Sequence, residues 1–486
     1  MSQINESSIK TPGVYVNEIP SFPPSVAQVA TAIPAFIGYT EKAIDAKGKS
    51  LNLIPKRITS LLEYQQYFGG APKELNLEIA IAEHHDSNSK LVSADIKATF
   101  NGGAPSTKYL MYYSMQMFFM NGGGTCYIVS VNDYASGGGT VSNTALQSGL
   151  DAIEPEDEPT LIIFPDGQGI ASAANYYTLQ NNSLALCAKL QDRFALIDIW
   201  DNSSDTNTNA QTFRGDPTPA NGIGANNLNY GATYYPNLIT TLVYIYDDSA
   251  VPLTITVADG PGGAVLTSTD MAGLATENKV IYNQATATIG LVGVEIAPSS
   301  VIAGVIAVVD GTRGVWKAPA NVSINGIQDL TDNVTDASQE NLNIDPGSGK
   351  SINAIRAFTG KGLLVWGART LDGNSNDFRY VSVRRFYIMV EESVKKAAMA
   401  FVFEPNDANT WVKVRAMIEN YLTNLWRLGA LAGAKPEQAF YVKVGLGSTM
   451  TFDDILNGKM IVEIGMAPVR PAEFIILRFT QIQQTS

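Results

Sequence analysis

The sequence predicts a multidomain protein of mixed α/β and α+β class, and three observations lead to that prediction. The chain has 486 residues, and one domain per roughly 150 residues gives about three domains. Residues 159–200 alternate a buried strand, a helix and a second buried strand, a pattern typical of a parallel sheet. A long amphipathic helix with strand patterns after it, near the C-terminus, indicates a separate α+β domain.

An extended arm opens the chain. Residues 13–19 have a β-rich composition and lie between Pro12 and Pro20, which prevent a strand or helix from continuing. A lone strand between prolines has no local partner. We therefore expect it to add to a sheet edge, either in its own fold or in another copy of the chain.

The middle of the chain carries the α/β pattern and two insertions. Residues 71–108 are polar and predict a peripheral insertion, and residues 237–300 contain short alternating strands with turn residues, which predict a second insertion of β type. The regular elements expected here are strands at 35–38, 126–131, 161–164 and 194–199 and helices at 109–120 and 176–193.

The C-terminal part predicts two helices and a hairpin. Apolar residues recur at helical spacing in 383–403 and again in 411–428, where Asn409 or Thr410 is the expected cap and Gly429 the end. Two strand patterns follow at 460–464 and 474–482, joined through a proline-rich connection. We expect these two strands to pair with each other as a compact hairpin.

Charge and composition exclude several classes of function. The 33 Lys and Arg against 46 Asp and Glu give a net charge of −13, which argues against nucleic acid or an anionic membrane as the main partner. Residues 351–486 have 16 basic and 12 acidic side chains, or +4, which leaves −17 for residues 1–350. This asymmetry indicates either a basic face with an acidic partner or internal ion pairs, and both interpretations stay open.

The sequence shows no signal for secretion or for membrane insertion, and its two cysteines do not indicate a catalytic site. The first ten residues lack the basic and apolar regions of a signal peptide, and no apolar run approaches the roughly 18 residues of a membrane helix. We expect a soluble protein made in the cytoplasm, without direct membrane insertion. Cys126 and Cys187 lie in apolar contexts and are expected to be small buried side chains.

Candidate catalytic groups are few. His84 and His85 are the two histidines of the chain, and as neighbours in a polar stretch they are expected to be solvated surface residues rather than a base and its partner. Asp166 and Asp198 follow buried strands, where α/β sites often form, but neither has a partner base in sequence. We expect both to be structural.

The string Gly347-Ser348-Gly349-Lys350-Ser351 is similar to the end of a phosphate-binding loop. The first glycine of that motif would fall at Ile344, and no buried strand precedes it. A flexible loop is the better interpretation. Adjacent acidic pairs such as Asp453-Asp454 do not share a helix face and suit helix N-termini more than acid–base catalysis.

Several strings occur together, in order, from residue 11 to about residue 480. They are Thr11–Pro20, Phe36–Gly38, Phe118–Gly124, Gly304 with Asp310, Arg313–Asn321, Asn353–Arg356, Val365–Thr370, Arg379–Arg385, Phe403–Asn406 and Ala467–Ile475. As an ordered set they resemble the contractile phage-tail sheath family. The two insertions do not resemble its common core.

This resemblance implies a structural subunit of a phage tail, a tailocin or an extracellular phage-like injection particle. Such subunits form hexameric rings around an inner tube, with baseplate and terminal cap proteins as further partners, and they contract without hydrolysing nucleotide. They are assembled in the bacterial cytoplasm. The resemblance implies no enzyme, no cofactor and no metal site. A hydrolase on the same scaffold, and a static shell or adhesin, are the alternatives.

The resemblance also implies a domain plan. An N-terminal arm of residues 1–25 precedes a subtilisin-like α/β outer domain of residues 26–375, which has β-rich insertions and lacks protease machinery. A tube-facing α+β C-terminal domain follows at residues 376–470, and a C-terminal linker strand at residues 471–486. The N- and C-terminal strand arms are expected to complete sheets of neighbouring copies.

Two sets of site residues follow. The candidates for strand exchange between subunits are Val14, Tyr15, Val16, Ile19, Ile461, Val462, Ile464, Phe474, Ile475, Ile476, Leu477 and Phe479. The candidates for contact with an acidic inner tube are Arg427, Lys435, Lys443 and Lys459.

Overall fold

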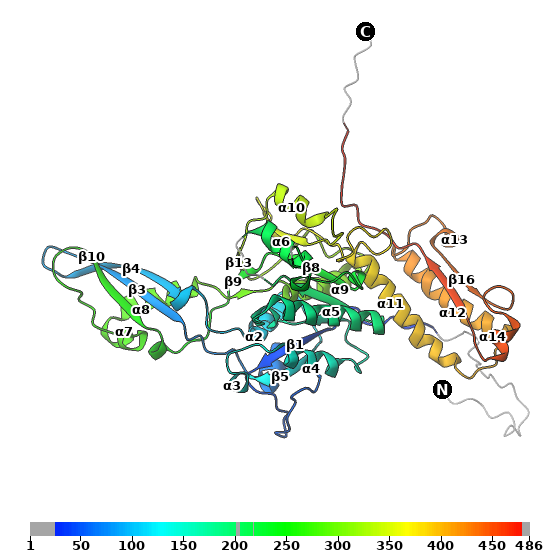
Figure 1. Ribbon diagram of the computed structural model, residues 1–486, viewed down its shortest axis with the longest axis horizontal. Coiled ribbons are helices and arrows are strands. Elements are labelled where there is room, and N and C mark those ends of the chain that lie inside the picture. The colour runs from blue at the N-terminus through cyan, green and yellow to red at the C-terminus, as the bar shows by residue number, and fades with distance from the viewer. Residues whose placement is uncertain (1–24, 201–204, 217, 479–486) are drawn as a thin grey trace, which may run out of the picture. The chain divides into compact units, whose positions relative to one another are not determined.

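The computed structural model (Figure 1) describes residues 25–200, 205–216 and 218–478. These residues form two compact units. The large unit contains residues 30–389 and 470–478, and the small unit contains residues 25–29 and 390–469.

A mixed sheet forms the centre of the large unit, with nine strands among the described residues in the order β12-β15-β14-β8-β7-β6-β1-β5-β2. The six strands from β14 to β5 run parallel, while the edge strands β12, β15 and β2 are antiparallel to their neighbours. The strands are β1 (Pro34–Thr40), β2 (Lys56–Ile58), β5 (Cys126–Asp133), β6 (Leu161–Ile163), β7 (Phe194–Asp198), β8 (Gly231–Tyr235), β12 (Val322–Ser323), β14 (Asn353–Phe358) and β15 (Gly362–Val365).

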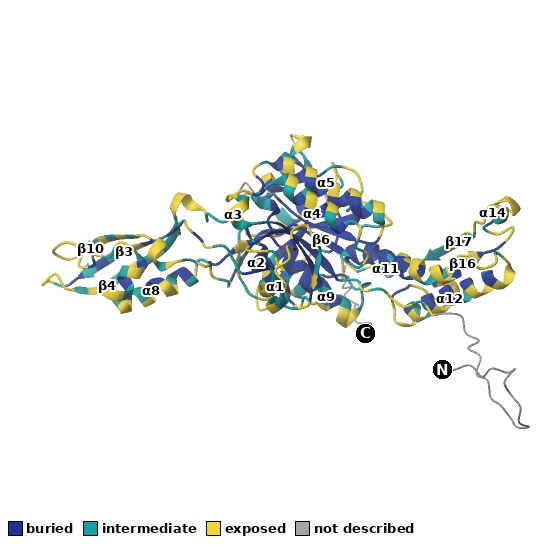
Figure 2. Ribbon diagram, turned by 90° about the horizontal axis from the view of Figure 1, so that it is seen from below, coloured by how far each residue is buried: buried dark blue, intermediate teal, exposed yellow. Residues whose placement is uncertain are grey.

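Helices cover both faces of this sheet. Figure 2 shows the buried strands between α4 and α5 on one side and α1, α2 and α9 on the other. Because both faces are covered, the central strands are mostly apolar, and every residue of β1, β6, β7 and β8 is buried. The helices are α1 (Leu61–Phe68), α2 (Met111–Met120), α3 (Tyr134–Gly137), α4 (Asn143–Ile153), α5 (Ala173–Leu190), α6 (Thr206–Arg214), α9 (Ser299–Arg313) and α10 (Asp336–Asn343).

The predicted strand–helix–strand unit is confirmed. Strand β6, helix α5 and strand β7 follow one another, and β6 pairs in parallel with β7. Helix α5 buries side chains three and four residues apart, including Tyr176, Gln180 and Leu184, against the sheet. Gln191 ends the helix in the left-handed region, at φ 60°.

The two predicted insertions fold together as one lobe, which we call the insert. It consists of β3 (Leu77–His85), β4 (Leu91–Phe100) and β10 (Leu253–Asp259) in the order β10-β3-β4, with α7 (Met271–Glu277) and α8 (Lys279–Gly290). Ile79 and Ile81 pack with Met271, Leu274 and Ile281 in a core separate from that of the central sheet. The all-strand interpretation of residues 237–300 is therefore wrong, because α7 and α8 supply the layer that covers this sheet.

A second small sheet is formed by short strands that flank the 253–290 segment of the insert in the sequence. Its order is β11-β9-β13, and all pairs are antiparallel. The strands are β9 (Leu238–Thr240), β11 (Glu295–Ile296) and β13 (Ile327–Leu330). Strand β9 is the central strand. Its pairing with β11 brings together the two ends of the 253–290 segment.

The small unit is built on one long helix and a two-stranded ribbon. Helix α12 buries Val414, Ile418, Tyr421 and Leu425 on one face, which confirms the predicted amphipathic helix. Its N-cap, however, is Asp407, whose Oδ1 accepts a hydrogen bond from the Thr410 N–H at 3.0 Å. The elements are the C-terminal half of α11 (Val381–Ala398), α12 (Ala408–Arg427), α13 (Pro436–Ala439), α14 (Phe452–Leu456), β16 (Phe440–Val444) and β17 (Val462–Met466).

The predicted hairpin between residues 460–464 and 474–482 is wrong. Strand β17 pairs antiparallel with β16, with Val442 opposite Ile464 and Val444 opposite Val462. Residues 470–478 have no regular secondary structure. The alternation of the 440–444 segment already suits a half-buried strand, and its valines pack toward α12, so β16 is the better partner for β17.

Candidate functional site

The central sheet contains the place where doubly wound folds bind ligands, and here that place is filled. Across the sheet, the first parallel strand of the chain, β1, has the second, β5, on one side and the third, β6, on the other, followed by β7 and β8. The direction in which strands are added therefore reverses between β1 and β6. Ligands bind such sheets at the carboxyl ends of the strands beside this reversal. Helix α2 (Met111–Met120) begins there, and the buried Met111 side chain packs against β1, where a Cβ on Gly38 would lie 3.0 Å from its Cε.

Asp166 holds the start of α2 in this position. Its Oδ1 accepts hydrogen bonds from the N–H groups of Leu110 at 2.6 Å and Met111 at 3.0 Å, and its Oδ2 accepts one from Tyr39 at 2.6 Å. Leu110 is the N-cap of α2 and has no side chain that can cap the helix, so Asp166, which follows strand β6, takes that role. A Cβ on Gly38 would collide with this carboxylate, which explains the glycine.

Asp198 does the same for α9. Its Oδ1 accepts a hydrogen bond from the Ser299 N–H at 3.0 Å, and its Oδ2 lies 2.6 Å from the Ser299 hydroxyl. The N-cap of α9 is Pro298, which also lacks a capping side chain. Burial raises the pKa of both aspartates to about 7, against which their hydrogen bonds act. Both carboxylates therefore serve helix ends, as expected for structural residues.

The loop that is similar to a phosphate-binding loop has its anion-binding groups already engaged. The Lys350 ammonium is buried and donates to the carbonyl oxygens of Arg214 at 2.9 Å and Ile223 at 2.6 Å. The Ser348 N–H donates to the Asp345 carboxylate at 2.7 Å. Burial lowers the pKa of Lys350, and the nearby Arg214 guanidinium lowers it further. The lysine and serine donors that would face a phosphate are thus bound to groups of the protein itself.

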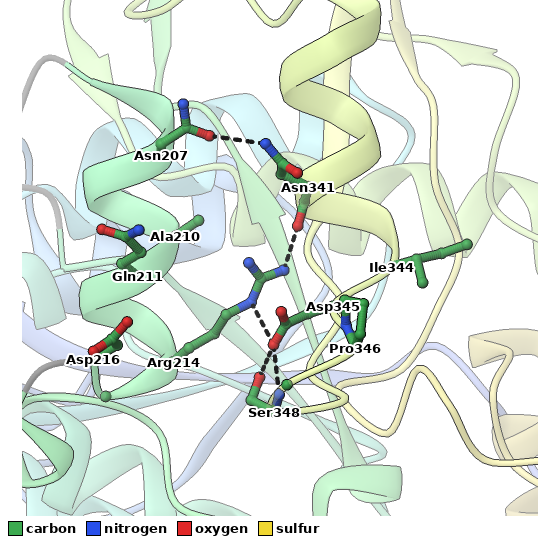
Figure 3. Close-up of a pocket in the computed structure, with 12 residues that line it drawn as sticks. Asn207, Ala210, Gln211, Arg214, Asp216, Asn341, Ile344, Asp345, Pro346 and Ser348 are labelled. Carbon is green, nitrogen blue, oxygen red and sulfur yellow. Dashed lines mark hydrogen bonds and ion pairs between the residues drawn. The ribbon is translucent and has the colours of Figure 1, made fainter.

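A pocket of about 620 Å³ lies beside this loop. Figure 3 shows α6 and α10 as its walls, with the amides of Asn207 and Asn341 facing each other. The Arg214 guanidinium donates to the Asn341 carbonyl at 2.7 Å and lies 3.6 Å from Asp345. Because the arginine is paired within the protein, the pocket presents amide and carboxylate groups rather than a free cation.

The histidines differ from the prediction. His84 is partly exposed between two aspartates, but the side chain of His85 is fully buried against Glu83 at 2.7 Å. The expectation of two solvated histidines is therefore wrong for His85. Alternation along β3 sends the two rings to opposite faces of the sheet. Within the described ranges no group of three His, Cys, Asp or Glu side chains is arranged to hold a metal, and no helix is long and apolar enough to cross a membrane.

The ribbon of β16 and β17 has two open edges, since neither strand has a second neighbour in the part of the chain that the structure describes. Val462 and Ile464 are half-buried on β17, whereas Ile461 lies just before the strand and is exposed. The Tyr441 ring lies so close to Gly465 that a Cβ there would overlap it, and its hydroxyl donates to Glu463 at 2.7 Å. This ribbon has the backbone groups that an added strand needs.

The C-terminal extension is fixed at one residue and exposed after it. The Arg369 guanidinium donates to Glu473 from Nε and Nη2, at 2.9 and 2.6 Å, and Asn343 donates to the same carboxylate at 2.9 Å. The next four side chains are 67–78% exposed and apolar. They are Phe474, Ile475, Ile476 and Leu477.

The remaining candidates for strand exchange, Val14, Tyr15, Val16, Ile19 and Phe479, lie outside the described residues. The candidates for tube contact lie on four different segments of the small unit. They are Arg427 in the last turn of α12, Lys435 at the N-cap of α13, Lys443 on β16 and Lys459 in the loop before β17. Lys443 lies 3.8 Å from Glu463.

The basic charge of the C-terminal quarter has a local explanation. Residues 390–469 contain eight Lys and Arg and nine Asp and Glu, whereas residues 351–389 contain six and two. The +4 therefore comes from 351–389, where Arg369 pairs with Glu473, Arg385 with Asp310 and Arg356 with Asp336. Arg385 and Arg356 pair with acids that precede residue 351, so internal ion pairs account for two of the four excess positive charges.

Exposed apolar side chains are concentrated toward the C-terminus. Of 29 large apolar side chains exposed in the described residues, 14 lie between residues 390 and 478. Phe403 is fully exposed and has a φ of 69°, a strained value for a side chain of this size. A surface of this kind is typical of a protein that is buried against partners.

Sequence reasoning missed three functional features. The Arg369–Glu473 pair joins residues 104 positions apart, and no periodicity links them. The buried Glu83–His85 pair could not be predicted without knowing that β10, from the second insertion, pairs with β3. Strand β16 had a visible signal, because residues 440–444 alternate between apolar and polar or aromatic side chains.

Two family models match the chain. The model of the phage tail sheath protein central domain matches residues 139–371, and that of the phage tail sheath C-terminal domain matches residues 374–482. Curated relatives include the tail sheath proteins of Vibrio phage KVP40, 25% identical over 182 residues, and of Salmonella phage ViI, 25% identical over 183 residues. These matches cover 37% and 36% of the chain and span about a quarter of the length of the relatives, at 25% and 28%.

Solved structures match over nearly the whole chain. The sheath of an extracellular contractile injection system, PVC, in its contracted state is 31% identical, with a TM-score of 0.62 and coverage of 97% of this chain and 98% of that one. The helical sheath of the anti-feeding prophage (AFP) in its contracted state is 34% identical, with a TM-score of 0.62 and coverage of 97% and 99%. A chain of the AFP baseplate structure is 32% identical, with a TM-score of 0.60 and coverage of 98% and 100%.

Proposed function

Because this chain belongs to the phage tail sheath family, we propose that it is a structural subunit of a contractile injection machine. Copies of the chain assemble as a sheath around an inner tube, and the sheath contracts to drive the tube through a target envelope. The observation that carries this proposal is the match, over almost the full length of the chain, to two sheaths in the contracted state.

The geometry of the chain supports a structural role rather than a hydrolase. The carboxylates at the strand ends cap helices, and the lysine of the phosphate-loop-like string binds two carbonyl groups. The energy for contraction then lies in packing between subunits. If the contracted lattice buries more apolar surface per subunit, its free energy is lower by roughly 25 cal/mol for each additional Å² buried.

We propose that the terminal arms link the subunits by strand exchange. Residues 14–19 and 474–479 of neighbouring copies would add to the open edges of the β16–β17 ribbon, through main-chain hydrogen bonds. The exposed apolar side chains of 474–477 and the unpaired edges of the ribbon support this. A small shared sheet moves as one body, so it tolerates rotation of the subunits during contraction.

We also propose that the small unit faces the inner tube, with Arg427, Lys435, Lys443 and Lys459 as contacts. The net charge of residues 390–469 is −1, so this contact depends on local patches rather than on a basic domain. Exposed ion pairs are individually weak and sensitive to salt. Charge reversal at these four side chains should therefore weaken co-assembly with the tube most at low ionic strength.

The finer features of the machine belong to the same proposal. They are hexameric rings, baseplate and terminal cap partners, assembly in the bacterial cytoplasm, and a subtilisin-like outer domain over residues 26–375 beside a tube-facing domain over 376–470. The doubly wound parallel sheet suits such a scaffold. In the proposed domain organisation, residues 1–25 and 471–486 are the two terminal arms.

Electron microscopy of assembled particles tests the proposal. The full chain is expressed with its tube and baseplate partners, and striated tubes of two lengths, extended and contracted, are expected. Deleting residues 1–20 or 474–486 should abolish long tubes while the subunit stays folded. Monodisperse particles from the full chain would contradict the sheath role, and normal tubes from both deletions would contradict strand exchange alone.

A further inference from the structure

Both histidines of the chain lie at one end of the insert, next to a loop that crosses the end of its sheet. We call residues 259–266 the strap. The strap follows β10 and contains three glycines, of which Gly260 and Gly262 have positive φ angles of 90° and 93°. A Cβ on Gly260 would come within 2.7 Å of the His85 side chain. The strap therefore lies directly against the end of β3.

His84 connects the three strands of the insert's sheet. Its Nε2 lies 3.2 Å from Asp95 on β4, and its Nδ1 lies 3.0 Å from Asp259 at the end of β10. The two carboxylates are 84% and 68% exposed, so each contact alone is weak. Together they join the first residue of the strap to the far edge of the sheet.

His85 and Glu83 form the buried part of the same arrangement. The Nδ1 of His85 lies 3.2 Å from the Pro261 carbonyl, and its Nε2 lies 2.7 Å from Glu83. The Glu83 carboxylate also accepts hydrogen bonds from the N–H groups of Val265 at 2.7 Å and Leu266 at 2.8 Å. Both ends of the strap are thus held by this one pair of side chains.

The acceptors determine the protonation state of His85. A carbonyl oxygen only accepts, so Nδ1 must carry a proton. Each oxygen of Glu83 accepts a backbone N–H, Oε2 from Val265 and Oε1 from Leu266, which favours the carboxylate, so Nε2 is the donor to Oε2. The same reasoning applies to His84, whose two nitrogens face two carboxylates. All the contacts of both rings are satisfied only when the rings are positively charged.

The surrounding charges favour the same state. The acidic groups around the rings are Glu83 on β3, Asp95 on β4, Asp259 at the end of β10, and Asp86 in the turn after β3. Lys90 is the cation of that turn, and it faces Asp86. On the helical side, Glu277 of α7 is held by Thr267 and Ser268, just beyond the strap.

We propose that protonated His84 and His85 lock the strap across the end of the insert, so that the insert is closed in mildly acidic medium and loosens as the medium becomes alkaline. When the rings lose their protons, Glu83 is left buried without a charged partner, and the strap's hydrogen bonds weaken. Leu266, which belongs to the insert's core, then becomes accessible. This inference does not depend on the sheath role.

The pH range follows from the direction of each shift. Hydrogen bonds to Glu83 and then to Pro261 raise the pKa of His85, and bonds to Asp259 and then Asp95 raise the pKa of His84, above the ordinary 6.5. Their stabilising contribution is complete below 6.5 and is lost as pH rises through the raised values. Burial opposes ionisation of Glu83, but its hydrogen bonds prevail and its pKa is below 4.5. The lock is therefore strongest between about pH 4.5 and 6.5.

Two measurements on the full chain test this inference. Because the chain has two histidines, proton–carbon NMR with labelled histidine gives one Cε1–H signal for each ring, and His84→Asn assigns the two. Hydrogen exchange then reports the protection factors of the strap amides at each pH, corrected for the intrinsic rate. We expect both rings to titrate above pH 6.5, and strap protection to fall at least tenfold over the same range, while protection of β6 and β7 stays constant.

A variant separates the lock from general alkaline destabilisation. In His85→Gln the strap should already be poorly protected at pH 6 and should lose its pH dependence. If that variant unfolds the insert, the wild-type measurements decide alone. A His85 midpoint at or below 6.5, or strap protection that does not change between pH 6 and 9, would overturn the proposal.

Discussion

The Arg369 guanidinium binds both carboxylate oxygens of Glu473, with Nε 2.9 Å from Oε1 and Nη2 2.6 Å from Oε2. Arg369 is almost fully buried, and Glu473 is one-fifth exposed. The pair fixes the chain at the last point before the exposed apolar segment 474–477. The extension therefore leaves the large unit from a defined residue, which sets how far its apolar segment reaches.

Removing the charge of Glu473 should destabilise the large unit. In Glu473→Gln the buried guanidinium loses its counter-charge, and we expect a loss of about 3 kcal/mol in the free energy of unfolding at pH 7. Burial raises the pKa of Glu473, but the bonds from Arg369 and Asn343 outweigh it and hold the pKa below 4.5. The difference between wild type and variant should therefore disappear as pH falls through that lowered value.

Glu463→Gln is the matched control for this measurement. Glu463 lies 3.8 Å from Lys443, and both side chains are about half exposed. Urea denaturation should show a change of less than about 0.5 kcal/mol for that variant. An equal effect of the two substitutions would mean that the bidentate pair does not fix the extension.

The two buried aspartates should respond differently to replacement by asparagine. At Asp198 one oxygen accepts from the Ser299 N–H and the other faces a hydroxyl, which can also accept from an amide. At Asp166 both oxygens face only backbone N–H groups. We expect Asp198→Asn to fold with native stability at pH 7 or better, and Asp166→Asn to lose about 1–3 kcal/mol, because an amide donor faces the Tyr39 N–H.

The pH dependence gives this prediction its sign. Burial raises the pKa of Asp198 from 3.8 to about 7. Its contribution to stability is complete below 3.8 and falls as pH rises through about 7. Relative to Asp198→Asn, the wild type should therefore lose stability between pH 4 and 7, as measured by denaturation at a series of pH values. A difference that grows in the opposite direction would contradict the raised pKa.

The sequence predicts well those parts of the fold that depend on local pattern. The β6–α5–β7 unit follows from two apolar runs and one helical stretch, and α12 follows from spacing alone. Pairing between distant segments is harder to predict from the sequence. Strand β17 joins β16 rather than the 474–482 segment, and β10 crosses from the second insertion to β3 in the first. Register between distant strands is decided by packing, which periodicity does not encode.

The candidate site shows the same division. The apolar, β-rich run at 474–477 is visible in the sequence because it is a local property, whereas its exposure is seen only in the structure. The anchor at Glu473 and the buried state of His85 depend on residues far along the chain. The +4 charge of residues 351–486 illustrates the converse error, because a sum over a segment does not distinguish free cations from those in internal pairs such as Arg385 with Asp310.

Lys350 should matter for stability and not for nucleotide binding. Lys350→Met leaves the carbonyl oxygens of Arg214 and Ile223 buried without a donor, which should cost about 1–3 kcal/mol. Thermal denaturation checks this, with the exposed Lys361→Met as control. Magnesium and ATP should leave the melting temperature of the wild type unchanged. A nucleotide-dependent rise that Lys350→Met removes would contradict the structural role.

The exposed C-terminal segment should be needed for assembly and dispensable for folding. In an added strand, successive side chains point to opposite faces, so Ile475→Asp and Ile476→Asp test one face each. Both side chains are more than three-quarters exposed, and each variant should melt within about 1 °C of the wild type, because little apolar burial is lost. At least one variant should reduce assembled tubes more than tenfold, as counted by electron microscopy.

Leu62→Asp is the matched control, because Leu62 on α1 is 74% exposed and lies outside both arms. It should assemble as the wild type does, which would show that a new surface carboxylate is not itself harmful. Because strand addition relies on main-chain hydrogen bonds as well as on side-chain burial, a proline at residue 476 should be at least as damaging as the aspartate. Normal tubes from Ile475→Asp, Ile476→Asp and Ile476→Pro together would show that residues 474–477 do not pair with a neighbouring copy.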